Sequence, residues 1–297
     1  MGESQAVQWD GRSRGGRWGY QFFIWVLRTC GVGVAYFFLA FVVVYFIPFA
    51  PRATRAVWRY HRSRRGLGMV RAAAAVYFHY YVFGQTLIDK IAMRAGGADR
   101  YRYEFDNVDR FWALHGDGAG VVFIGAHVGC WEAGAAFFGT IGRTMNIVKK
   151  DAEHEEIKAA LASSGEGLQN YRVIALNDEP LTAVVAMKLA LDRGEYVCFN
   201  GDRYMREENV RPVDFLGAKA LFPLGPFVVA QKCRVPVVFF YAMRERGRRY
   251  RFVFVESEAA QRVEDLQEQY VRSLEGMVRR YPHQWFNFYD FWGVANA

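Results

Sequence analysis

Two residues with the types and spacing of a catalytic pair lie in the stretch VVFIGAHVGCWEAGAAFFG, residues 121–139. His127 is followed five positions later by Glu132. An imidazole is an effective general base near neutral pH, and a carboxylate can fix its tautomer and stabilise its protonated form. Such a pair could take the proton from a hydroxyl that attacks a thioester, so that no serine nucleophile is needed.

These two side chains cooperate only in a particular local structure. On one continuous helix, residues five apart point about 140° from each other. We therefore predict a buried strand at 121–125, a turn that holds His127, and a helix over 129–139 with Glu132 in its early turns. Gly125 and Gly129 would allow a close backbone approach, and N–H groups at the helix start could stabilise an oxyanion.

Helical and extended patterns alternate along the rest of the chain. They predict helices at 72–93, 181–193, 226–232 and 261–280, and strands at 196–199, 235–243 and 250–256. This alternation is typical of an α/β fold, here a mixed central sheet flanked by helices. Ligands commonly bind at strand ends in such sheets, which favours a functional role for a histidine placed just after a strand.

The N-terminal part has the pattern of an uncleaved membrane anchor. Residues 29–50 carry no charge and match the roughly 20 residues that span a bilayer. Seven arginines follow between positions 52 and 71, so by the positive-inside tendency this flank lies in the cytoplasm. A buried core helix, or one that only dips into the bilayer, remains the alternative.

These patterns divide the chain into three parts. We expect residues 1–17 to be disordered or loosely attached, because they are polar and rich in glycine and arginine. Residues 18–65 would form the anchor with its basic juxtamembrane segment. Residues 66–297 would form one catalytic domain, since neither repeats nor a low-complexity linker divide them.

Composition narrows the possible partners. A formal net charge of +8 attracts nucleic acid, anionic lipid headgroups or an acidic carrier protein. The chain carries no recognisable nucleic-acid-binding module, so we expect no nucleic acid partner.

Cysteine and histidine spacing indicates neither a disulfide framework nor a metal site. The four cysteines form no CxxC pair and lie in apolar stretches, as buried cysteines of a reducing compartment do. We find no cluster with metal-ligand spacing, which disfavours a metal-dependent hydrolase and predicts no bound metal. We interpret the histidines other than His127 as surface or packing residues, namely His61, His79, His115, His154 and His283.

With these motifs in order, the chain resembles the lipid A late acyltransferases of Gram-negative bacteria, within the wider glycerolipid acyltransferase group. The resemblance rests on the anchor with its basic exit and on GAHVGCWE, which is similar to the family's HxxxxD/E motif with His127 and Glu132 on the two motif positions. It also rests on a block in which Asp202 precedes the segment VDFLG, and on a C-terminal strand hairpin followed by a helix and PHQW. It covers nearly the whole chain.

This resemblance implies acyl transfer from acyl carrier protein, or from acyl-CoA, to a hydroxyl of a membrane lipid or glycolipid. It implies an α/β core on the cytoplasmic face of the bacterial inner membrane, with His127 as general base and Glu132 orienting it. No cofactor is implied beyond the acyl donor. We assign Gly129, Asp202, Arg203 and Lys219 to substrate binding, the charged groups to a phosphate or the carrier arm. An ion pair between Asp202 and Arg203 is the structural alternative.

Departures from the family pattern leave the acceptor open. Gly201 stands where the family usually has glutamine, and the ending WFNFYDFW replaces a more basic one. That ending resembles relatives from aryl-polyene pathways, so an acceptor other than lipid A is an alternative. A thioesterase that uses the same pair, and a non-catalytic lipid- or carrier-binding subunit of a membrane complex, are the rival functions.

Overall fold

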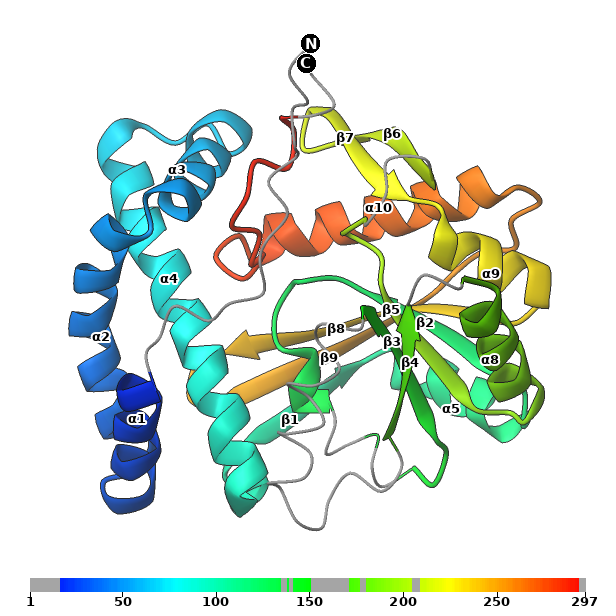
Figure 1. The fold of residues 1–297 in the computed structure, drawn as a ribbon, viewed down its shortest axis with the longest axis horizontal. Coiled ribbons are helices and arrows are strands. Elements are labelled where there is room, and N and C mark those ends of the chain that lie inside the picture. The colour runs from blue at the N-terminus through cyan, green and yellow to red at the C-terminus, as the bar shows by residue number, and fades with distance from the viewer. Residues whose placement is uncertain are drawn as a thin grey trace.

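A seven-stranded mixed sheet forms the centre of the protein (Figure 1). The structure is a computed structural model and describes residues 17–134, 138, 141–150, 171–176, 180–204 and 209–293. The strands run in the order β1-β9-β8-β2-β5-β3-β4. Every neighbouring pair is parallel except the antiparallel hairpin of β8 and β9. The predicted mixed central sheet is confirmed.

The strands of this sheet are β1 (Arg102–Asp106), β2 (Val121–Gly125), β3 (Met145–Lys150), β4 (Tyr171–Leu176), β5 (Tyr196–Asn200), β8 (Val237–Glu245) and β9 (Arg249–Glu256). A separate antiparallel hairpin consists of β6 (Val210–Phe215) and β7 (Ala218–Pro223). The helices are α1 (Arg17–Thr29), α2 (Val32–Phe49), α3 (Pro51–Arg59), α4 (Met69–Ala92), α5 (Val108–Gly116), α8 (Pro180–Asp192), α9 (Gly225–Cys233) and α10 (Val263–Arg280).

Strand β2 is apolar along its whole length because both of its faces are covered. Successive side chains of a strand point to opposite faces. Val122 and Ile124 belong to the core that includes Tyr270 of α10, whereas Phe123 packs on the other face against Phe111 of α5. The central strand is thereby fixed from both sides, and the residues that follow it start from a rigid point.

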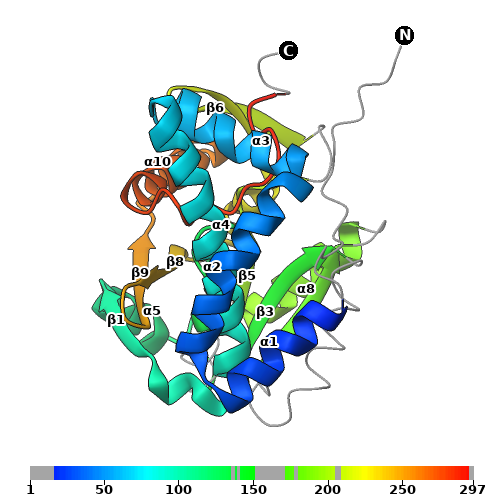
Figure 2. The ribbon, with the colours of Figure 1, turned by 90° about the vertical axis from the view of Figure 1, so that its left-hand side faces the viewer.

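The N-terminal helices stand together at one end of the sheet (Figures 1 and 2). Helix α2 packs against α4 at close range, since a Cβ on Gly84 would lie 2.5 Å from the Leu39 side chain. The opposite face of α2 is open, with Phe37, Phe41 and Tyr45 exposed over 61–65% of their surface. By length and composition alone, α2 could cross a membrane, and it corresponds to the anchor expected at 29–50.

A buried polar cluster ties α2 to the sheet. Asp89 of α4 is fully buried and accepts hydrogen bonds from the hydroxyls of Tyr36 on α2, Tyr101 and Tyr250. Its carboxylate also pairs with Arg244 of β8, with 2.9 Å between Oδ2 and Nε. Buried charges need such partners. One face of α2 is therefore built into the folded domain.

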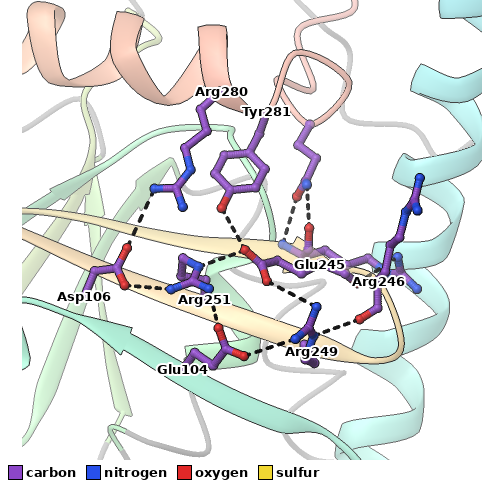
Figure 3. A network of polar contacts seen from close by, with 10 residues as sticks. Glu104, Asp106, Glu245, Arg246, Arg249, Arg251, Arg280 and Tyr281 are labelled. Atoms are coloured by element: carbon purple, nitrogen blue, oxygen red, sulfur yellow. Dashed lines mark hydrogen bonds and ion pairs between the residues drawn. The ribbon is translucent and has the colours of Figure 1, made fainter.

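The end of α10 is held by an ion-pair network over the β8–β9 hairpin (Figure 3). Arg251 of β9 donates to Glu245 and to Asp106, at 2.8 Å in both cases. The Tyr281 hydroxyl donates to the same Glu245 at 3.0 Å, and Arg280 lies 3.7 Å from Asp106. The chain that leaves α10 therefore starts from a defined position.

The structure describes only part of the N-terminal segment expected to be disordered, and it describes the basic run as helical. Residues 1–16 of the segment expected to be disordered lie outside the described residues, and the seventeenth already belongs to α1. Between the anchor and α4, the basic run forms α3 and the π-helical turn η1 (Tyr60–Arg64).

Candidate active site

The register of the sheet brings His127 and Asp202 together. Strands β2 and β5 are parallel neighbours, with Gly125 opposite Asn200 at their carboxyl ends. His127 follows β2 by two residues and Asp202 follows β5 by two residues. Equal offsets from two paired strand ends place the two side chains at the same edge of the sheet.

Asp202 holds His127 through both of its carboxylate oxygens. Oδ1 lies 2.8 Å from Nδ1 of the imidazole, and Oδ2 accepts the backbone N–H of His127 at 2.9 Å. A carboxylate only accepts, so the imidazole proton is on Nδ1 and the lone pair is on Nε2. The His127 side chain is 27% exposed and that of Asp202 only 2%. A reactant can thus reach the ring but not its carboxylate partner.

The electrostatics of the pair favour an ionised carboxylate. Burial by itself raises the pKa of the Asp202 carboxyl. The charge and hydrogen bonds of His127, together with the charge of Arg203, outweigh that effect and hold the pKa below its usual value. An ionised carboxylate at Nδ1 is the arrangement that stabilises an imidazolium once Nε2 has taken a proton.

The turn that carries His127 is clamped between β8 and the segment after α10. The His127 carbonyl accepts the N–H of Phe286 at 2.8 Å. Gly129 donates to the Gln284 carbonyl at 2.9 Å, and it has φ +68°. A Cβ there would lie 2.2 Å from the Ala242 oxygen, so this position requires glycine. Gly129, predicted to bind substrate, has its N–H engaged within the protein and shapes the turn.

Glu132 lies close to this turn in the chain, as predicted. The helix expected over 129–139 begins two residues late, as a 3₁₀ turn, η4 (Trp131–Ala133), because residues 128 and 129 are held in bridges to Trp285 and Ala242. The later positions 135–137 and 139–140, and the Glu132 side chain, lie outside the described residues. The role of Glu132 stays a prediction, while Asp202 occupies the Nδ1 side of the ring that we expected Glu132 to hold.

The other predicted binding residues are separated in space. Arg203 stays near the pair, where it donates to the Phe286 carbonyl at 3.2 Å and lies over the ring of Tyr289. Lys219 belongs to the β6–β7 hairpin, which Figure 1 shows beyond α10, and it pairs with Asp214 at 2.9 Å. The described contacts thus bring His127, Asp202 and Arg203 together but do not include Lys219 in that group.

An apolar cleft opens beside the strand ends. Its lining comes from β2, β3, β4, β5 and β8, from the η4 turn and from Phe138. Gly125, Trp131 and Asn200 are among the residues that line it, and each lies within five positions of His127 or Asp202 in the chain. Aromatic and aliphatic side chains dominate the wall of this small cleft.

Sequence reasoning missed two features of this site. The sequence assigns Asp202 to substrate binding, although its position three residues beyond the strand predicted at 196–199 is a usable signal for a site residue. The contribution of Gln284, Trp285 and Phe286 to the His127 turn was not predicted, because no local pattern links residues that lie more than 150 positions apart.

Comparison with known proteins agrees with the motifs. No curated protein matches the chain. Residues 78–293 match the family described as bacterial lipid A biosynthesis acyltransferase, and this span includes β2, the His127 turn, Glu132 and Asp202. The match covers well over half of the chain, so the protein belongs to the bacterial lipid A biosynthesis acyltransferase family.

Proposed function

We propose that this protein transfers a fatty acyl group from the thioester of acyl carrier protein, or of acyl-CoA, to a hydroxyl of a membrane lipid or glycolipid. The observation that carries the proposal is the His127–Asp202 pair at the carboxyl ends of β2 and β5, in a chain of an acyltransferase family. An oriented imidazole with its Nε2 lone pair open to a reactant is what the attack of a hydroxyl on a thioester requires.

In the proposed reaction, Nε2 of His127 accepts the proton of the acceptor hydroxyl while its oxygen attacks the thioester carbonyl. The tetrahedral intermediate then collapses, the carbon–sulfur bond breaks, and the imidazolium returns the proton to the departing thiolate. Asp202 stabilises the imidazolium between the two steps. The new ester and the free carrier thiol are the products, so protons and charges balance.

Glu132 and the basic residues have subsidiary roles in this proposal. With Nδ1 engaged by Asp202, Glu132 would act from the Nε2 side, where it could orient the acceptor hydroxyl. Arg203, beside the pair, suits a phosphate of the acceptor or of the carrier arm. Lys219 would meet the acidic carrier protein at a distance from the chemistry, as part of a basic surface that speeds encounter.

Donor and acceptor would approach from different directions. The apolar cleft at β2, β3 and β5 would hold the acyl chain next to His127. The exposed aromatic face of α2 would lie in the inner membrane and place the domain at the cytoplasmic face, within reach of a lipid acceptor. The family and the apolar helix both support membrane association.

Mass spectrometry of lipid extracts tests the proposal. Cells that carry the wild type, His127→Ala or His115→Ala at matched expression would be compared. His115 is a control because its ring is hydrogen bonded to Tyr196. We expect one lipid to gain an acyl mass increment with the wild type and with His115→Ala only. Release of free fatty acid without an acylated lipid would favour a thioesterase, and identical extracts would favour a non-catalytic subunit.

A further inference from the structure

Three histidines that are far apart in the sequence converge beside the active-site turn. His61 lies in the π-helical turn η1, His79 on α4, and His283 in the turn after α10. One ring nitrogen from each lies within 4.8 Å of the others. His61 and His79 are completely buried, and His283 is partly buried. We call these residues the histidine cluster.

Packing alone does not account for this cluster. Within the described residues, His61 Nε2, both ring nitrogens of His79 and His283 Nδ1 are buried and make no hydrogen bond of normal geometry. A buried polar group left unpaired usually destabilises a protein, and several at one point require an explanation. The rings around the cluster are aromatic, as in the contacts of His79 with Phe286 and Phe288. The backbone groups of Trp285 and Ala75 also lie close enough to act on the rings of His79 and His283.

Burial favours the neutral form of the three imidazoles. Burial lowers the pKa of His61 to about 2 and that of His79 to about 3, with the backbone of Trp285 weakly opposing the second shift. Burial and the charge of Arg65 also lower the pKa of His283. Burial thus disfavours the protonated form of each ring, and a neutral imidazole offers a lone pair to a metal.

We propose that His61, His79 and His283 together bind one divalent transition-metal ion of the zinc type. Three imidazoles suit Zn²⁺, with a fourth position for water or another donor. Zn–N bonds of about 2.0–2.1 Å in tetrahedral geometry separate the nitrogens by roughly 3.4 Å. The ring nitrogens would thus approach one another by up to about 1.4 Å from their present spacing, a change within reach of side-chain rotation.

The positive charge and the hydrogen bond of Arg65 disfavour metal binding by His61. Its Nη1 lies 3.0 Å from His61 Nδ1, so the guanidinium donates to that nitrogen and leaves the ring proton on Nε2. Metal binding through Nε2 requires the proton to move and Arg65 to release the ring. A metal-bound histidine normally donates its other N–H to an acceptor. Arg65→Gln removes the positive charge and supplies such an acceptor, so we expect it to tighten metal binding.

The bound ion would position the active-site turn rather than enter the reaction. It would link the basic segment after α2 and helix α4 to the chain at His283. The next residues hold the catalytic turn, through the Gln284 carbonyl on Gly129 and the Phe286 N–H on the His127 carbonyl. Loss of the ion would loosen this turn, and that effect stands whether or not the proposed acyl transfer is correct.

Metal analysis and thermal unfolding of the purified full chain in detergent test this proposal. Protein stripped with a chelator would receive Zn²⁺ or Mg²⁺, and bound metal would be counted by plasma mass spectrometry after gel filtration. We expect one Zn²⁺ per chain, and a rise in Tm of about 5–10 °C at a Zn²⁺ concentration about 100 times Kd, with no response to Mg²⁺.

Matched variants separate the cluster from other zinc-binding groups. His61→Phe and His283→Asn should lose the stoichiometric zinc and the Tm response. Tyr60→Phe, which removes only a hydroxyl bonded to the Pro282 carbonyl beside the cluster, should keep both. Arg65→Gln should lower Kd for Zn²⁺ by about tenfold or more, as expected when a nearby like charge is removed.

Two results would overturn the proposal. The first is folded wild-type protein whose Tm does not respond to Zn²⁺, Cu²⁺, Co²⁺ or Ni²⁺ and which stays free of metal. The second is zinc that binds equally to wild type, His61→Phe and His283→Asn. If those two variants fail to fold, the response of the wild type and the comparison with Arg65→Gln decide, because neither depends on them.

Discussion

Asp202→Asn distinguishes the carboxylate that orients His127 from the one that the sequence motif suggests. In the structure, Asp202 accepts two hydrogen bonds from His127, one from Nδ1 and one from the backbone N–H. Asparagine has the same shape but only one acceptor oxygen, and its other group is an NH₂ donor. If the oxygen keeps the backbone N–H, the NH₂ faces Nδ1 and forces the ring proton onto Nε2. Nε2 then has no lone pair for the acceptor proton.

The expected effect is large and appears in kcat. Loss of the correct tautomer costs about 10⁴-fold in kcat when the same substitution is made in a Ser-His-Asp triad. We expect a loss of about 10²–10⁴-fold here, with KM nearly unchanged, because Asp202 is too buried to touch substrate. Acyl transfer from carrier thioester to extracted lipid would be measured with purified protein, and thermal unfolding would confirm the fold.

A control and a rival variant complete this experiment. Asp214→Asn removes a carboxylate that is 77% exposed and paired with Lys219, so it should leave kcat unchanged. Glu132→Gln should also lower activity, because the proposed role of Glu132 is to orient the acceptor hydroxyl. Wild-type kcat in Asp202→Asn, together with loss of activity in Glu132→Gln, would refute our reasoning and restore Glu132 as the orienting acid.

Four further predictions follow from contacts in the fold. Gly129→Ala should lower the free energy of unfolding in urea by roughly 3 kcal/mol, because a Cβ at φ +68° would lie 2.2 Å from a carbonyl oxygen. Asp89→Asn should cost about 3–5 kcal/mol in the same assay, because its buried arginine loses its anionic partner. Phe37→Arg combined with Phe41→Arg should reduce the flotation of the protein with vesicles. The control, Leu181→Arg combined with Val185→Arg on the exposed face of α8, should leave flotation unchanged. In chelator-treated protein, burial holds the pKa of His79 at about 3, so only the unfolded chain gains this proton below pH 6.5. His79 should therefore contribute a fall in stability of about 1.4 kcal/mol per pH unit there, in addition to the fall from His61, and His79→Phe should remove that contribution from the slope.

The local parts of the fold were predictable from the sequence. The run VVFIG predicted β2 correctly because a fully buried strand must be apolar on both faces. The helix expected at 261–280 corresponds to α10, and the strands expected at 235–243 and 250–256 form the β8–β9 hairpin. Strands β1, β3, β4, β6 and β7 were not predicted, and β4 (Tyr171–Leu176) is partly exposed with no clear alternation to reveal it.

The partner of His127 was not predictable in the same way. Its identity depends on the pairing of β2 with β5, which sets Gly125 opposite Asn200. A shift of one residue in that register would turn Asp202 away from the imidazole. The motif drew attention to Glu132 because it is near in sequence, whereas the fold supplies a carboxylate from 75 positions away.

The segment after α10 contacts both the histidine cluster and the turn that carries His127. Its start is fixed by the hydrogen bond from Tyr281 to Glu245 of β8 and by the ion pair of Arg280 with Asp106 of β1. His283 contributes to the histidine cluster, and the following residues hold the backbone of the His127 turn. His61 and His79 approach this segment from the elements that follow the apolar helix α2, so packed contacts connect these elements with the His127 turn. Substitution of the cluster should therefore lower kcat more than it raises KM, since it would misplace His127 without removing a substrate contact.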